Sequence, residues 1–142
     1  MQIQKQIRVI FLQAKENGQK VRHLCEQAQE HLAKKHKLIF YSDSEKALEY
    51  IDNLLWSTPS LGFIPHEITH SESDQLIILT SSLANLNSSN AIFNLSNQPI
   101  TSPDPMISII YELDDATSPA KKTISQKKFE AYKQERFHLM TQ

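Results

Sequence analysis

The strongest constraint on the fold is an alternation of short apolar runs with amphipathic helical segments in the first half of the chain. Residues 8–13, 37–41 and 76–79 have the length and apolar character of buried strands. Between them, apolar residues recur at helical spacing in two segments, one beginning at Val21 and the other at Ala47. Strands that alternate with helices in this way run parallel and are joined by right-handed crossovers. We therefore expect an α/β fold, a small three-layer sheet that is mostly parallel.

The second half of the chain predicts two more strands and one helix. The strands are expected at residues 91–95 and 106–111, and the Ser-, Asn- and Pro-rich residues 80–104 are expected to form loops around the first of them. Ser118 followed by Pro119 is typical of a helix start, and this last helix should run into the 130s.

Capping signals also set the expected limits of the second helix. Ser42 with Glu45 three residues later fits a capping box at its start. Its end is expected near Trp56, because Pro59 pushes the residue before it out of the helical region. No composition shift divides the chain, so we expect a single domain over residues 1–142.

Glycine and cysteine are too scarce for several kinds of site. The chain has 2 glycines and 1 cysteine among its 142 residues. Two glycines are too few to build a dinucleotide-binding or a phosphate-binding loop. The sheet should therefore resemble a mononucleotide-binding fold that lacks the phosphate loop. We expect no cofactor. A single cysteine excludes an intrachain disulfide, a Cys-rich zinc site and a Cys-ligated iron–sulfur cluster. Cys25 lies on the apolar face of the first helix, which indicates packing.

Charge is balanced overall but unevenly distributed. The net charge is −1, with basic segments at both ends and an acidic region over residues 38–120. This pattern predicts little direct binding to nucleic acid, whereas the basic C-terminal segment suits an acidic partner or a solvated helix face. No segment approaches the roughly 18 apolar residues of a membrane span, and no signal-peptide pattern is present, so we expect a cytoplasmic protein that does not contact a membrane.

Residues 66–70, His-Glu-Ile-Thr-His, match the H-E-x-x-H pattern of zinc proteases. That chemistry needs both histidines on one helix face. Pro65 and the β-branched residues inside the motif do not favour a helix there. We therefore expect no metal site, and keep a small zinc hydrolase that uses His66, Glu67 and His70 as one alternative function. A degenerate nucleotide-sensing domain is another alternative.

Two further segments are suited to contacts with proteins. Trp56, Phe63 and neighbouring apolar residues lie in a proline-containing loop, which is either a lid on the core or an exposed partner patch. On the last helix, Phe129 and Tyr132 are flanked by Lys128 and Lys133. This group either binds an acidic peptide with an apolar end or packs its rings on the sheet with its lysines in solvent.

The chain resembles the chi subunit of bacterial DNA polymerase III. The motifs that carry the resemblance are Asp-Asn-Leu-Leu-Trp at residues 52–56, then Pro59, and Phe-Ile-Pro-His at residues 63–66. The C-terminal Phe-x-Ala-Tyr at residues 129–132 and Phe-x-Leu at residues 137–139 also match. The resemblance covers essentially the whole chain.

This resemblance implies an accessory, non-catalytic subunit of the replicative polymerase. Members of the family bind the acidic C-terminal tail of single-stranded-DNA-binding protein, which ends in Pro-Phe, and a psi subunit that connects them to the clamp loader. The tail-binding residues implied here are Gln126, Lys127, Lys128, Phe129, Tyr132 and Lys133, and the residues implied for a psi-like partner are Trp56, Phe63 and Pro65.

The chain departs from the family pattern at two positions on the last helix. Gln126 stands where the family has an arginine, and Glu130 where it has a lysine. An acid beside an incoming acidic tail is repulsive unless nearby lysines compensate.

Overall fold

The structure is a computed structural model and describes residues 6–58 and 64–142. In chain order its elements are β1 (Arg8–Ala14), α1 (Asn17–Lys34), β2 (Leu38–Tyr41), α2 (Glu45–Ser57), β3 (Glu67–Ile68), β4 (Ile77–Thr80), β5 (Ala91–Asn94), β6 (Ile109–Asp115), α3 (Pro119–Gln134) and β7 (His138–Thr141). Within these ranges, no helix is long and apolar enough to cross a membrane.

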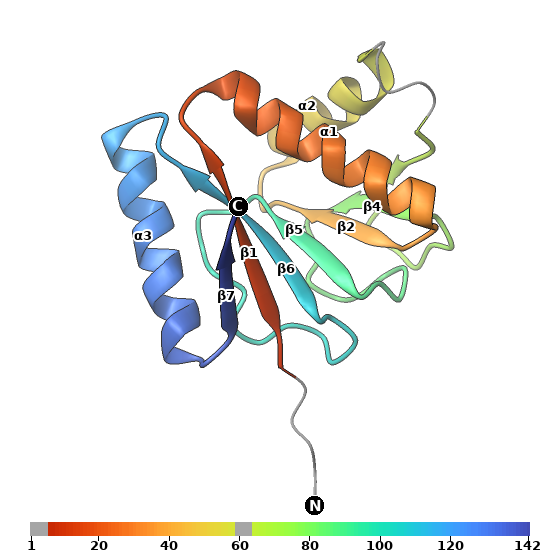
Figure 1. The fold of residues 1–142 in the computed structure, drawn as a ribbon. Helices are drawn as coiled ribbons and strands as arrows, with labels where there is room; N and C mark the ends of the chain where they lie inside the picture. The colour runs from red at the N-terminus through yellow and green to blue at the C-terminus, as the bar shows by residue number, and fades with distance from the viewer. Residues whose placement is uncertain (1–5, 59–63) are drawn as a thin grey trace, which may run out of the picture.

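The strands form one parallel sheet in the order β3-β4-β2-β5-β6-β1-β7. Every neighbouring pair is parallel, including β1 with β6 and β2 with β5 in the middle of the sheet. In Figure 1, α1 and α2 lie to one side of the sheet and α3 to the other. The predicted three-layer α/β fold is therefore confirmed.

Alternate side chains of each strand face the two outer layers. In β1, Ile10 and Leu12 belong to the core beneath α1 and α2, whereas Val9 and Phe11 belong to the core beneath α3. In the described parts of the chain, α3 is the one helix over the second core, and the connection between β5 and β6 completes this layer with Ile100 and other buried residues. The predicted loops of residues 80–104 thus form part of a layer.

The N-termini of α2 and α3 test the two predicted caps. Ser118 caps α3 as predicted, because its Oγ accepts a hydrogen bond from the Lys121 backbone N–H at 3.2 Å. The predicted cap of α2 is wrong by two residues, because Ser44, not Ser42, accepts from the Ala47 N–H, at 3.3 Å. Ser42 instead continues the β2 pairing and donates its N–H to the Thr80 carbonyl at 3.2 Å.

Strand limits in the polar parts of the sheet differ from the prediction. The expected strand at residues 106–111 begins only at Ile109 and continues to Asp115. Residues 104–107 form a turn instead, in which the Ile107 N–H donates to the Asp104 carbonyl. The edge strands β3 and β7 were not predicted, because they are two and four residues long and carry no apolar run.

A buried histidine joins α1 to the sheet. His31 is 7% exposed, and its Nε2 accepts from the Tyr111 hydroxyl at 3.0 Å, while its Nδ1 donates to the His36 carbonyl at 3.1 Å. A neutral imidazole satisfies both contacts. Burial lowers the pKa of His31 and raises that of Tyr111 to about 12.

This histidine should make folding stability depend on pH. Because the pKa of His31 is lower in the folded chain, the unfolded chain takes up the proton first as the pH falls below 6.5. We expect the free energy of unfolding to decrease from about pH 7.5 to about pH 5.5, by at most about 1.4 kcal/mol per pH unit from this one group. Urea unfolding at both pH values should show a smaller decrease for His31→Gln, and an equal decrease would contradict this assignment.

Candidate functional site

Helix α3 divides the predicted tail-binding residues between its two faces. Gln126, Lys127 and Lys133 are exposed, and Phe129 is half-buried. Lys128 and Tyr132 point inward and are 7% and 0% exposed. The structure therefore does not bring the six residues together on one surface.

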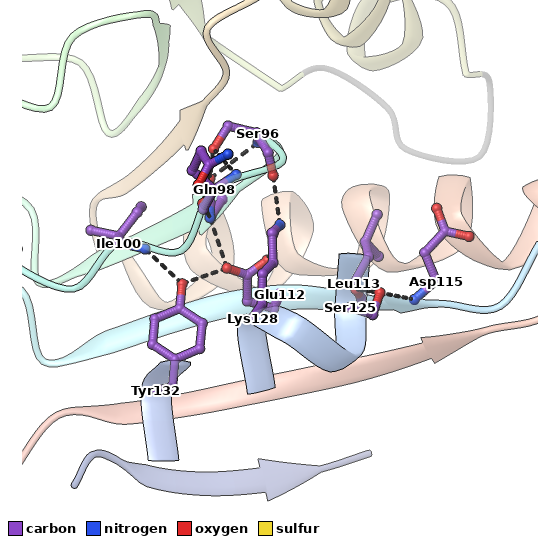
Figure 2. A network of polar contacts seen from close by, with 10 residues as sticks. Ser96, Gln98, Ile100, Glu112, Leu113, Asp115, Ser125, Lys128 and Tyr132 are labelled. Atoms are coloured by element: carbon purple, nitrogen blue, oxygen red, sulfur yellow. Dashed lines mark hydrogen bonds and ion pairs between the residues drawn. The ribbon is translucent and has the colours of Figure 1, made fainter. Parts of the chain in front are cut away.

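Lys128 and Tyr132 belong to a buried polar network centred on Glu112 of β6 (Figure 2). The Lys128 Nζ donates to Glu112 Oε1 at 2.8 Å and to the Ser96 carbonyl at 2.5 Å. The Tyr132 hydroxyl donates to Glu112 Oε2, which also accepts from Asn94 Nδ2 at 2.7 Å. Both oxygens of the carboxylate are therefore satisfied inside the protein.

The same network reaches the loop that follows β5. The Ile100 N–H donates to the Tyr132 hydroxyl oxygen at 2.9 Å, and Asn94 Nδ2 also donates to the Gln98 carbonyl at 2.7 Å. Burial raises the pKa of Glu112, against the lowering effect of the Lys128 charge and of the three donors. Burial and the nearby carboxylate raise the pKa of Tyr132. This network fixes the position of α3 on the sheet.

Sequence reasoning did not find Glu112 or Asn94. The available signal was a carboxylate inside an otherwise apolar strand, Ile-Ile-Tyr-Glu-Leu at residues 109–113. A buried carboxylate needs a cation or several donors, but the sequence does not say which lysine supplies the charge.

An open groove lies between α3 and the nearby end of the sheet. Its volume is about 500 Å³, and its lining includes Phe11, Lys122, Gln126, Phe129, Glu130 and Thr141. The Phe129 ring packs on the Phe11 ring with centroids 5.4 Å apart. The groove therefore has an apolar floor and a polar rim.

The exposed surface of α3 is predominantly basic. Its exposed cations are Lys121, Lys122, Lys127 and Lys133, and Glu130 is its exposed acid. Asp114 adds a second acid to the groove lining. The arrangement suits a ligand that carries both negative charge and an apolar end.

Two residues of the second predicted patch lie at and beyond the end of α2. Trp56 is 48% exposed, and Pro65 is half-buried. Phe63, the third predicted residue, lies outside the described residues. The Trp56 ring lies on the His66 ring with centroids 4.1 Å apart, and its Nε1–H donates to Asp52 Oδ1 at 3.1 Å.

The H-E-x-x-H match does not form the helical arrangement of a zinc protease. Glu67 and Ile68 form strand β3 beside β4, and the Glu67 carboxylate accepts from Ser73. The His66 ring contacts Asp52, whereas His70 lies 3.4 Å from Glu45. In the described parts of the chain, no three His, Cys, Asp or Glu residues form a group that could hold a metal.

A smaller polar hollow lies at the carboxyl ends of β5 and β6, where nucleotides bind in related sheets. It encloses about 200 Å³, and Lys20 and Lys128 are among its lining residues. Lys20 is already paired with Asp115 at 3.0 Å, and Lys128 with Glu112. These ion pairs reduce the attraction for a phosphate, and nothing in the hollow favours the nucleotide-sensing alternative.

Comparison with protein families identifies the chain. The protein-family model described as DNA polymerase III chi subunit, HolC, matches residues 7–140. The chain belongs to this family. No match was found among curated proteins.

The family gives the two surfaces a context. A chi-family chain is an accessory subunit of DNA polymerase III, so contacts with other proteins are the relevant chemistry of its surface. The groove on α3 and the Trp56 patch (Trp56 and Pro65 among the described residues) are the two candidate contact sites. The Glu112 network is the internal support of the first.

Removing the Glu112 carboxylate should strongly destabilise the fold. Glu112→Ala leaves the Lys128 ammonium buried without its counter-charge, which costs about 3–5 kcal/mol. Urea unfolding measures this loss. The matched control Lys127→Ala, an exposed neighbour on the same helix, should change the free energy of unfolding by less than about 0.5 kcal/mol. Similar effects of the two substitutions would show that the buried pair does not hold α3.

Proposed function

We propose that this chi-family chain is a non-catalytic adaptor between single-stranded-DNA-binding protein and the clamp loader of the polymerase. The groove on α3 binds the acidic C-terminal tail of single-stranded-DNA-binding protein, and the Trp56 patch binds a psi-like subunit. The single observation that carries the proposal is the groove, which has an aromatic floor and a polar rim on a helix whose exposed surface is predominantly basic, in a chain of a DNA polymerase III subunit family.

The chemistry of the groove matches a tail that ends in Pro-Phe. Phe11 and Phe129 provide the apolar contact for the terminal aromatic ring. Lys122 lies on the rim, and Lys127 and Lys133 are exposed on the same helix, where they attract the acidic residues of the tail. Apolar burial contributes affinity, and the lysines mainly raise the association rate.

The departures from the family pattern lie inside this groove. Gln126 offers a hydrogen-bonding amide in place of a charge, and Glu130 repels an acidic ligand. Lys122 on the same rim offsets part of this repulsion. Lys128 and Tyr132 contribute indirectly, because their contacts with Glu112 hold α3 and therefore Phe129 in place.

The Trp56 patch provides the second contact. Trp56 and Pro65 offer an aromatic ring and a rigid apolar residue, a combination common in protein interfaces. Two weak contacts on one small protein raise the local concentration of each partner for the other. In this proposal the chain works in the cytoplasm and makes little direct contact with DNA.

The first test is binding of a tail peptide. A labelled peptide of about ten residues from the C-terminus of the same organism's single-stranded-DNA-binding protein should bind saturably in the micromolar range, about −8 kcal/mol. Fluorescence polarisation measures this, and deleting the terminal Phe should abolish the binding. Phe129→Ala should weaken the complex, whereas Tyr50→Ala, an exposed aromatic on α2, should not. Absence of binding, or binding indifferent to the terminal Phe, would refute the tail contact.

Reversing the charge at position 130 should strengthen the tail complex. Glu130→Lys replaces a repulsive groove charge with an attractive one, and exposed pairs contribute about 0.2–1 kcal/mol each. We expect the dissociation constant to fall by about two- to tenfold at low salt, with a smaller change at high salt. Glu135→Lys, the same charge change outside the groove, is the control. Equal affinity changes for the two variants would place the tail elsewhere.

Truncating Trp56 should separate the two contacts. Trp56→Ala should weaken binding of the psi-like subunit by more than about fivefold, because aromatic anchors at interfaces contribute over 1 kcal/mol. Tail-peptide affinity should stay unchanged, and calorimetry with each partner measures both. If Trp56→Ala weakened the tail alone, the assignment of the two surfaces would be reversed.

A further inference from the structure

The residue beneath Trp56 has an unusual set of hydrogen-bonding partners. The His66 side chain is fully buried. Its Nδ1 lies 2.6 Å from the Ile64 carbonyl oxygen. Its Nε2 lies 3.0 Å from Asp52 Oδ1 and 3.3 Å from the Asp52 carbonyl oxygen.

These three oxygens indicate where the protons lie. Carbonyl oxygens and an ionised carboxylate only accept hydrogen bonds, and a neutral imidazole carries a proton on one nitrogen only. With a neutral ring, one nitrogen would therefore direct a lone pair at an oxygen lone pair. Asp52 Oδ1 also accepts from the Trp56 Nε1–H. The geometry thus fits an imidazolium that donates from both nitrogens, to Ile64 on one side and Asp52 on the other.

The second ring proton of His66 also favours the contact with Trp56. The Trp56 ring lies on the His66 ring, with centroids 4.1 Å apart and planes 35° apart. A cation against the face of an indole is attracted by its π electrons. Asp52 ties the two rings together, because its Oδ1 contacts the His66 Nε2 and the Trp56 Nε1. Loss of the proton removes both the cation and one of the two hydrogen bonds of His66.

Other charged groups near His66 are engaged elsewhere or point away, in the part of the chain that the structure describes. On α2, Glu49 is exposed, and Glu45 contacts His70 at 3.4 Å. On β3, Glu67 is exposed and bonded to Ser73. The neighbouring strand β4, Ile77–Thr80, carries no titratable side chain. Asp52 is therefore the charged group that responds to the protonation of His66.

We propose that the Trp56 patch is proton-dependent, with His66 and Asp52 as positioning residues: an imidazolium at His66 strengthens the ring contact that orients Trp56 for binding. As the pH rises and the proton leaves, the ring contact weakens and the partner's affinity falls. The consequence for the partner rests on the proposed function, but the proton-dependent position of Trp56 does not.

Tryptophan fluorescence tests the proposal in the isolated chain. Trp56 is the only tryptophan of the sequence, so its emission reports on this site alone. An imidazolium in contact with the indole quenches its emission, so the intensity should rise along a one-proton curve between about pH 5 and pH 9. His66→Gln, which retains a donor but does not titrate, should abolish the curve. Asp52→Asn should move its midpoint to lower pH, because the charge that stabilises the imidazolium is gone.

The control variant is His70→Gln, the other histidine beside α2, which should leave the curve unchanged. A flat wild-type curve, or a His66→Gln curve like that of the wild type, overturns the proposal. If His66→Gln does not fold, nitrogen NMR of the wild-type imidazole at about pH 6 decides. Two protonated ring nitrogens support the proposal, and a single neutral tautomer overturns it.

The partner measurement separates this proposal from the proposed function. Affinity of the psi-like subunit should decrease with pH for the wild type and stay constant for His66→Gln. Absence of binding at every pH together with an intact fluorescence titration refutes the second contact and supports the proton link. If binding depends on pH equally in the wild type and in His66→Gln, the role of the His66 proton in partner affinity is overturned.

Discussion

The position of α3 depends on one buried ion pair. Glu112 sits in the middle of the sheet with no solvent to stabilise its charge, and Lys128 reaches it from the helix at 2.8 Å. Because breaking such a pair leaves an uncompensated charge inside the protein, helix and sheet are held in one register. Tyr132 extends the same constraint to Ile100 and therefore to the loop that completes this side of the core. The helix, the loop and the groove beside them share a single anchor.

This anchor explains why Lys128 and Tyr132, two of the six predicted tail-binding residues, do not act at the surface. A helix exposes about half of its circumference when it packs on a sheet, and here two residues of the predicted site are used to attach it. Phe129 lies between the two roles, since it packs on Phe11 and also forms the floor of the groove. A surface of this kind recognises a ligand through a few exposed side chains on a rigid support, which is consistent with an accessory subunit that contacts other proteins.

The fold followed from the sequence because its strands and helices carry strong, distinct periodicities. The alternation of apolar runs with helical stripes predicted the α/β class, and the Ser118-Pro119 start of α3 was confirmed by a cap hydrogen bond. The cap of α2 was misplaced because three serine and aspartate residues in a row offer the same signal, and tertiary pairing of Ser42 with β4 decides among them. The short edge strands β3 and β7 exist through pairing with neighbours, a long-range effect with no local pattern.

The candidate site was less predictable. The family motifs located the two candidate segments in the sequence. They did not show that Lys128 and Tyr132 point inward, because burial of a lysine depends on a carboxylate in a distant strand. The contacts of His66 with Ile64 and Asp52 likewise depend on how the end of α2 meets the chain before β3. Sequence periodicity does not predict the role of a residue whose contacts come from a distant part of the chain.

The order of the strands sets the distance between the two candidate surfaces. The Trp56 patch lies where α2 contacts β3 and β4, at one end of the sheet, and the groove lies where α3 contacts β6 and β7, at the other. Six inter-strand steps of about 4.8 Å separate the two edge strands, or roughly 29 Å. A hydrogen-bonded sheet does not stretch, so it acts as a spacer of fixed length. Ligands bound at its two ends would occupy separate sites, and the sheet would keep the distance between them constant.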